Sequence, residues 1–130
     1  MAKYFEANKP KKSILVGDLN IAPQKEDVWD HKKLLKIVSH TPQEIEALNL
    51  VKSSANWIDI TRKSIPLGLL YSWWSYRARD WDKADKGRRL DHIWATSDIA
   101  KYGYDSRILR ETRGWDKPSD HAPVFASFDL

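Results

Sequence analysis

A short apolar run that ends in two polar side chains is the feature that most constrains this chain. The run from Ile14 to Val16 is β-branched and aliphatic, which predicts a buried strand. Asp18 and Asn20 follow at alternate positions, and alternate residues of an extended chain point to the same side. We therefore expect a carboxylate and an amide fixed together on a rigid element, as a catalytic site requires. The alternative is a simple turn, because Asp and Asn side chains readily bond their own backbone.

The composition excludes several classes of protein. The chain has 130 residues, of which 42% are hydrophobic and 31% are charged, which indicates one globular domain rather than a disordered segment. No apolar run approaches the length of a membrane span, and the Lys-rich N-terminus lacks the apolar block of a signal peptide. Cysteine is absent, which excludes disulfides and thiolate metal sites. We expect a cytoplasmic protein without a membrane partner.

The charge and the tryptophan content favour a polyanionic partner. The net charge is +4, which suits a partner such as nucleic acid without requiring one. Seven tryptophans are unusual for a chain of this length. Some of them must lie in the core, but flat aromatic side chains beside arginines are also typical of nucleic-acid surfaces.

Helical signals are concentrated in the first half of the chain. Residues 1–8 have the pattern of the end of a helix, and residues 30–38 place apolar side chains at helical spacing. The clearest start signal is Thr41 followed by Pro42 and Glu44, which combines an N-cap, a proline in the first turn and a capping-box glutamate. We expect a helix from Pro42 to about Ala55 that packs on the core.

Strand signals dominate the second half. We expect strands at residues 71–76, 90–96, 104–111 and 123–130, a short extended piece at 57–60, and a helical turn at 97–100. Residues 62–66 and 77–88 are predicted to be loops, and Asp59 is expected to pair locally with Arg62. Helices followed by strands indicate a mixed α/β layout.

His121 is the strongest candidate for acid–base chemistry. It follows Asp120 and precedes Pro123, so the pair is expected in a loop before the last strand. Histidine titrates near neutral pH but needs a partner to fix its tautomer, and Asp91 at the start of its own strand is suitable. Asp120 would then be free to bind a hard cation such as Mg²⁺. The alternative is that Asp120 and His121 only cap a loop.

Aromatic and basic residues alternate in a second candidate region. The residues concerned are Trp73, Trp74, Tyr76, Arg77, Arg79 and Trp81. Arginine can hold a phosphate through two hydrogen bonds, and an aromatic ring can stack on bases. We expect one of Trp73 and Trp74 to be buried, and Trp81 and the arginines of the region, including Arg89, to lie on the surface. The alternative is a core role for the tryptophans and a solvated loop for the charges.

The remaining histidines give no site signal. His31, His40 and His92 lack metal-ligand spacing, so they are expected to be structural or to face solvent.

Four stretches in order resemble the exonuclease III family of abasic-site endonucleases, within the endonuclease/exonuclease/phosphatase superfamily. These are residues 17–23, 71–77, 89–92 and 119–124. The resemblance runs over nearly the whole chain but covers only the second half of the family's domain. The first half, which supplies an early Asn, a metal-binding Glu and a catalytic Tyr, has no counterpart before Gly17.

The resemblance implies a four-layer α/β sandwich with two stacked sheets. Residues 1–130 would be its C-terminal half: one mixed, largely antiparallel sheet with helices on its outer face, and the N-terminal half absent. A sandwich cut in half exposes an apolar sheet face. We therefore expect the chain to self-associate as a twofold dimer with the inner sheets face to face.

The resemblance also implies Mg²⁺-dependent hydrolysis of the DNA phosphodiester at abasic sites and 3′ ends, with Mn²⁺ as a possible substitute. Asp18 would handle protons, Asn20 would hold the phosphate, and His121, oriented by Asp91, would contact the scissile phosphate. Asp120 would lie at the metal together with Asp18 and Asn20. The segment from Trp73 to Trp81 would contact double-stranded DNA.

Three functions remain open at this point. The chain is half of a repair nuclease that is weakly active or inactive alone, because it lacks the metal Glu and the Tyr. It is a non-catalytic DNA-binding remnant. Or it is a phosphodiesterase of the same superfamily that acts on RNA, phosphoinositides or lipid head groups.

Overall fold

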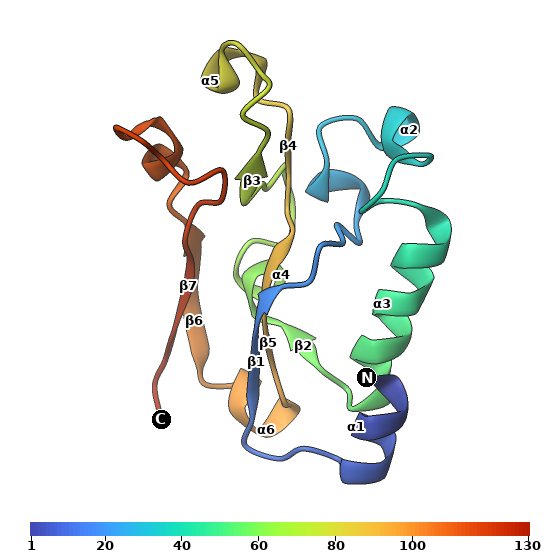
Figure 1. Cartoon of the computed structure of the whole chain (residues 1–130). Helices are drawn as coiled ribbons and strands as arrows, with labels where there is room; N and C mark the ends of the chain where they lie inside the picture. Colours follow the sequence, from blue (N-terminus) through green and yellow to red (C-terminus); the bar gives the residue numbers. More distant parts are fainter.

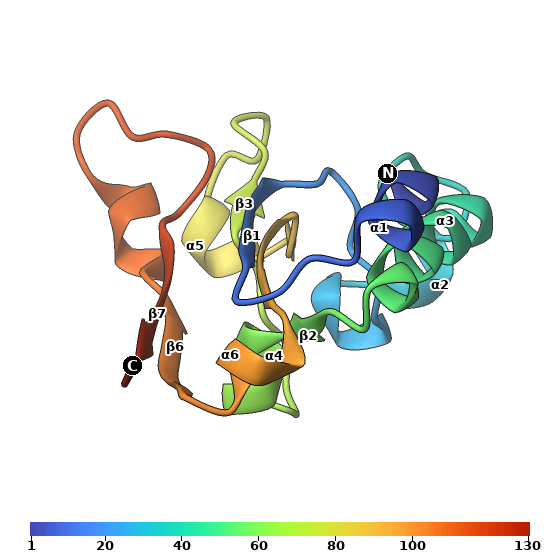
Figure 2. The same ribbon diagram turned by 90° about the horizontal axis from the view of Figure 1, so that it is seen from below.

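Residues 1–130, described here by a computed structural model, form three layers. One outer layer holds the helices α1 (Ala2–Asn8) and α3 (Pro42–Ser54), and the middle layer is a sheet around β1 (Ile14–Asp18) and β5 (Asp91–Ala95). The hairpin of β6 (Gly103–Ile108) and β7 (Val124–Phe128) lies on the other side of this sheet (Figures 1 and 2).

All strand pairs are antiparallel. The middle sheet has the order β1-β5-β2, where β2 is Ile58–Asp59, and β3 (Trp73–Trp74) pairs with β4 (Gly87–Arg88). The hairpin β6-β7 forms the third set, and a bridge between Trp73 and His121 joins it to β3. The α/β class is confirmed, whereas the single sheet expected from the sequence is divided into three hydrogen-bonded sets.

The period of β1 and β5 sorts their side chains onto two faces. Leu15 and Trp94 are register partners and pack toward α1 and α3, where Leu48 and Trp57 complete a buried cluster. Ile93 and Ala95 point to the opposite side and pack against apolar side chains of β7. Alternation therefore explains why β5 is buried on both faces. Burying one large apolar side chain stabilises the fold by about 1.5–3 kcal/mol.

The helix expected from the capping box is present. Thr41 accepts a hydrogen bond from the Glu44 backbone N–H, and the Glu44 side chain accepts one from the Thr41 backbone N–H, so both helix-end donors are satisfied. The expected helix at residues 30–38 is shorter, because α2 covers only His31–Leu34. None of the helices combines the length and the apolar composition that a membrane crossing requires.

The loop expected at residues 62–66 was wrong in its first part. Helix α4 (Ile60–Ser64) occupies it, because the Asp59 side chain caps the helix by accepting from the Arg62 backbone N–H. The loop expected at 77–88 contains the short helix α5 (Trp81–Ala84), capped by Asp80, and then β4.

The strand expected at residues 14–16 is present as β1, but its expected burial was wrong, because Ile14 and Val16 are 44% and 65% exposed. Strand boundaries also differ from those expected. Only Trp73–Trp74 is strand within residues 71–76, and β6 ends at Ile108 before the 3₁₀ helix η2 (Arg110–Gly114). A second 3₁₀ turn, η1, covers Lys25–Asp27, and the expected helical turn is present as α6 (Ser97–Ala100).

Two carboxylates and two guanidinium groups form a fully buried charge cluster below the sheet end. Arg89 donates to Asp27 at 2.7 Å and to Asp59 at 2.8 Å, and Arg62 donates to Asp27 at 2.7 Å. Asp59 and Arg62 are bonded locally as expected, but through the Arg62 backbone N–H, because the Arg62 guanidinium reaches Asp27 instead. The surface position expected for Arg89 was wrong as well, since its side chain is fully buried. These four groups hold the chain segment just before Asp91 in place.

Candidate active site

Asp18, Asp91 and His121 meet where β1 ends and β5 begins. The His121 Nδ1 atom lies 2.8 Å from Asp91 Oδ2, and the His121 Nε2 atom lies 3.7 Å from Asp18 Oδ2. One ligand atom of each residue lies within 4.8 Å of the others. His121 and Asp18 keep about a third of their side-chain surface exposed, at 32% and 37%. Asp18 and Asp91 thus lie on paired strands, while the side chains of the group remain accessible to solvent.

Backbone pairing explains why these three residues meet. Asp18 and Asp91 are register partners at the end of the β1–β5 ladder. His121 follows a separate route: the Trp74 backbone N–H donates to the Asp120 carbonyl at 3.0 Å, and the Ala122 N–H donates to the Ser72 carbonyl at 2.7 Å. These two bonds flank His121 and fix its position beside β3. The imidazole is therefore placed by regular structure, not by a free loop.

The electrostatic surroundings favour the charged imidazole. Partial burial alone would lower the pKa of His121. The hydrogen bond and charge of Asp91 oppose this effect, and the charges of Asp18 and Asp120 add to the opposition. The net result is a pKa of His121 raised above its ordinary value. A cationic His121 with Nδ1 held by Asp91 can offer its Nε2–H to an anion.

Ser72 is a contact of the site that the sequence reasoning missed. Its hydroxyl donates to Asp91 Oδ2 at 2.7 Å, the same oxygen that His121 contacts. Ser72 lies within the 71–77 stretch that resembles the family, but its side chain carries no charge and was not singled out there.

Asn20 and Asp120 lie differently from the arrangement expected for a metal site. Strand β1 ends at Asp18, and Asn20 has a left-handed backbone with φ 57°, so the two residues do not share the face of one extended strand. Asp18 Oδ1 accepts from the Asn20 backbone N–H at 2.9 Å, which is turn chemistry. Asp120 accepts a hydrogen bond from Trp73 Nε1 at 3.0 Å and is outside the group of three ligand atoms. The metal roles of Asn20 and Asp120 stay predictions.

The aromatic and basic residues divide into buried and exposed members. Trp74 is only 2% exposed, which confirms that one of Trp73 and Trp74 is buried, while the DNA contact expected of Trp74 stays a prediction. Trp73 is half-buried and carries the Arg88 guanidinium 5.3 Å from its ring centre. Tyr76, Arg77 and Arg79 are exposed, as expected for a contact surface.

Two arginines that the sequence did not single out contact Trp81 and Tyr76, and Trp81 is not on the surface as expected, because it packs against the buried Trp74. Arg110 lies 4.6 Å from the centre of Trp81, which is half-buried, and Arg113 lies 4.9 Å from the centre of Tyr76. Arg113 also donates to the Trp74 carbonyl at 3.2 Å. Because both arginines come from η2, about thirty residues further along the chain, local sequence patterns could not indicate this contact.

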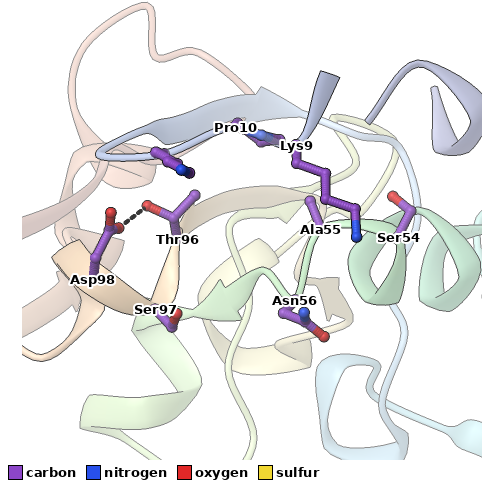
Figure 3. Close-up of a pocket in the computed structure, with 9 residues that line it drawn as sticks. Lys9, Pro10, Ser54, Ala55, Asn56, Thr96, Ser97 and Asp98 are labelled. Carbon is purple, nitrogen blue, oxygen red and sulfur yellow. Dashed lines mark hydrogen bonds between the residues drawn. The ribbon is translucent and has the colours of Figure 1, made fainter. Parts of the chain in front are cut away.

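A hollow with a mainly apolar lining lies beside the site. It has a volume of about 550 Å³, and Asp91 and His121 form one end of it while Val16, Ile93 and Val124 line the other. A second hollow of about 290 Å³ lies at the opposite end of β1, between the Lys9–Lys11 segment, the end of α3 and the start of α6 (Figure 3). It has Asp98 as its only carboxylate and no histidine, so we assign no chemistry to it.

Comparisons with known proteins agree with this geometry. The model of the Endonuclease/Exonuclease/phosphatase family matches residues 2–121. Exodeoxyribonuclease III of Haemophilus influenzae is 32% identical over 98% of this chain, and the chain spans 51% of that relative. An AP endonuclease from Archaeoglobus fulgidus superposes with a TM-score of 0.93 at 29% identity, covering 99% of this chain and 51% of that one.

A further solved structure contains nucleic acid. The 3′ phosphatase NExo from Neisseria, bound to product DNA hairpin, superposes with a TM-score of 0.90 at 30% identity over 99% of this chain and 50% of that one. This chain therefore spans about half the length of the proteins it matches. The resemblance to exonuclease III and AP endonucleases is confirmed, and with the family model matching most of its length the chain belongs to the Endonuclease/Exonuclease/phosphatase family.

Proposed function

We propose that this chain is the C-terminal, phosphate-binding half of an exonuclease III-type DNA-repair nuclease. The reaction is hydrolysis of the DNA phosphodiester at abasic sites and 3′ ends. The observation that carries the proposal is the Asp18–Asp91–His121 group at the open end of the sheet, where the exposed Tyr76 donates to the Pro118 carbonyl of the segment before His121. The names of the relatives, an exodeoxyribonuclease and an AP endonuclease, support the same reaction class.

Each residue has a chemical role in this proposal. His121, held by Asp91 and with a raised pKa, donates from Nε2 to an oxygen of the scissile phosphate and offsets the charge that develops there. Asp18, on the other side of Nε2, takes or returns the proton of the attacking water or leaving group. Asn20 is proposed to contact the phosphate with its exposed amide.

Some residues of this site are suitable ligands for a divalent cation. Mg²⁺ prefers carboxylate oxygens and keeps several waters, and Asp18 is exposed enough to provide such an oxygen. We propose Mg²⁺, with Mn²⁺ able to replace it, held by Asp18 with help from Asn20 and Asp120. Bound there, the cation would neutralise charge on the phosphoryl oxygens.

The test is incision of an abasic-site duplex by the purified chain in Mg²⁺. We expect Asp18→Asn to lower the rate of incision at least about 100-fold, the scale of a lost proton-transfer group. The matched control is Asp129→Asn, an exposed carboxylate near the C-terminus, which should leave the rate unchanged. Equal incision by wild type and Asp18→Asn would contradict the proposed role of Asp18.

A second candidate function is DNA binding without cleavage. It is favoured because this chain spans only about half the length of each relative. Any site residues that the relatives carry in their other half are absent from this chain. Duplex binding that weakens with salt, without Mg²⁺-dependent incision, would select it. The double variant Arg77→Ala with Arg79→Ala should lower the salt slope by about 0.9 per lost phosphate contact, whereas Lys101→Ala, directly after α6, should not.

We also propose that the chain self-associates through the apolar sheet face. Ile14 and Val16 lie on the face of β1 opposite Leu15, and they are 44% and 65% exposed. Nothing pairs with the outer edge of β1 either, because β1 ends its sheet. Sedimentation at micromolar concentration should give a dimer, and Val16→Lys should give a monomer. A monomeric wild type would overturn this proposal.

A further inference from the structure

Ser72 makes every hydrogen bond that a serine hydroxyl can make, and all of them are at the active site. Its side chain is fully buried. The hydroxyl oxygen accepts from the Leu90 backbone N–H at 2.9 Å and from the Asp91 backbone N–H at 3.1 Å. With both lone pairs engaged, its proton can only be donated to Asp91 Oδ2, which lies 2.7 Å away.

The backbone of Ser72 links the two chain segments that carry the pair. Its N–H donates to the Arg88 carbonyl at 2.9 Å, three residues before Asp91. Its carbonyl accepts from the Ala122 N–H at 2.7 Å, directly after His121. Ser72 is therefore bonded both to the chain segment next to Asp91 and to the chain segment next to His121.

We propose that Ser72 is a positioning residue for the Asp91–His121 pair. By holding Oδ2 from one side, its hydroxyl fixes the rotation of the Asp91 carboxylate so that the same oxygen meets His121 Nδ1. This fixes the tautomer with hydrogen on Nδ1 and leaves Nε2 directed toward Asp18. Its importance for catalysis rests on the proposed function, but the hydrogen bonding itself does not.

The experiment follows the His121 Nδ1 proton by NMR in the full chain. In wild type this proton should give a low-field signal that exchanges slowly with water. In Ser72→Ala the exchange should become about tenfold faster, the change expected for loss of one hydrogen bond. Ser72→Thr, which keeps a hydroxyl, should restore slow exchange. Ser75→Ala is the matched control, because Ser75 Oγ accepts only from the Arg77 N–H.

The outcome that would overturn the proposal is a Nδ1 proton that exchanges equally slowly in wild type and in Ser72→Ala. If Ser72→Ala does not fold, the wild-type protein still decides: the Ser72 hydroxyl proton should exchange slowly and lie close to the Asp91 amide proton, and its absence would overturn the proposal. Incision assays on the same variants keep the two proposals apart. Faster Nδ1 exchange in a chain that never incises DNA supports the role of Ser72 and counts against the proposed function.

Discussion

Two clusters in this molecule are built from the same kinds of groups and behave oppositely. In the cluster of Asp27, Asp59, Arg62 and Arg89, each carboxylate is matched by a guanidinium and no side chain is more than 6% exposed. In the Asp18–Asp91–His121 group, two carboxylates share one imidazole and all three side chains keep 22–37% of their surface. Buried charges that are fully paired hold the fold together, whereas exposed charges without a full set of partners can bind a ligand.

The pKa directions express the same contrast. Burial would raise the pKa of Asp59, but the charge and hydrogen bonds of Arg89 lower it below the ordinary value. The pKa of His121 is raised because its carboxylate neighbours outweigh its partial burial. The buried pair is therefore fixed in its charged form near neutral pH, while His121 is poised to change its protonation.

The largest expected effect is the removal of Arg89. Arg89→Ala leaves Asp59 buried without its guanidinium partner and Asp27 with Arg62 alone, which should lower the free energy of unfolding by about 3–5 kcal/mol. Urea unfolding followed by tryptophan fluorescence measures it. The control is Arg79→Ala, an exposed arginine that should change the free energy of unfolding by less than about 0.5 kcal/mol. A small loss for Arg89→Ala would mean that the buried cluster is not what holds the fold.

Acid should weaken the buried cluster. Since the folded-state pKa of Asp59 is lowered, its contribution to stability is complete above the ordinary Asp value and is lost as the pH falls through the lowered one. The free energy of unfolding should fall steeply below about pH 4. In Asp59→Asn the protein should be less stable at pH 7 and its acid dependence should be shallower. Parallel pH curves for the two proteins would contradict this assignment.

The bond between Trp73 and Asp120 should contribute less. Trp73→Phe keeps an aromatic ring but removes the Nε1–H donor to Asp120, so we expect a loss of about 1 kcal/mol in the free energy of unfolding. Trp115→Phe, at an exposed position, is the control. Thermal unfolding of both variants decides, and equal midpoints would show that the Asp120 contact is not stabilising.

The smallest effect on stability should come from His121. Its contribution to stability should fall as the pH rises, whereas that of Asp59 falls as the pH drops. Because its folded-state pKa is raised, the contribution of His121 is complete below the ordinary His value and is lost as the pH rises through the raised one. His121→Gln should therefore cost more stability at pH 5.5 than at pH 9, by less than about 1 kcal/mol, since the pair is partly exposed. A cost independent of pH would mean that His121 does not carry charge beside Asp91.

Local chemistry decided how much of this fold could be predicted from the sequence. The helix at Pro42–Ser54 was found because Thr41 and Glu44 form their capping box within four residues. Helix α4 was missed because its stability comes from tertiary burial of Ile60 and Thr61, which no local pattern reveals. The expected strand at residues 71–76 was reduced to two residues because its neighbours bond to Arg88 and Ala122 instead of to a regular ladder.

The site residues that could be predicted from the sequence are those with titratable side chains. Asp91 and His121 carry chemistry in their side chains, and the structure brings them into hydrogen-bond contact, while their catalytic roles stay predictions. Arg89 was misplaced because a basic residue next to other basic residues is typical of a surface. Ser72, Arg110 and Arg113 were missed because their contacts depend on which distant segments meet.

The buried charge cluster also bears on the order of folding. Its four members lie at positions 27, 59, 62 and 89, so three separate stretches of chain must converge before any of its ion pairs can leave water. Charges without partners are too costly to bury, so we expect the cluster to close late, after the apolar packing of β5 has formed. Substitutions in it should then accelerate unfolding and leave the folding rate nearly unchanged, and the lifetime of the native state would depend on Arg89, the arginine just before β5.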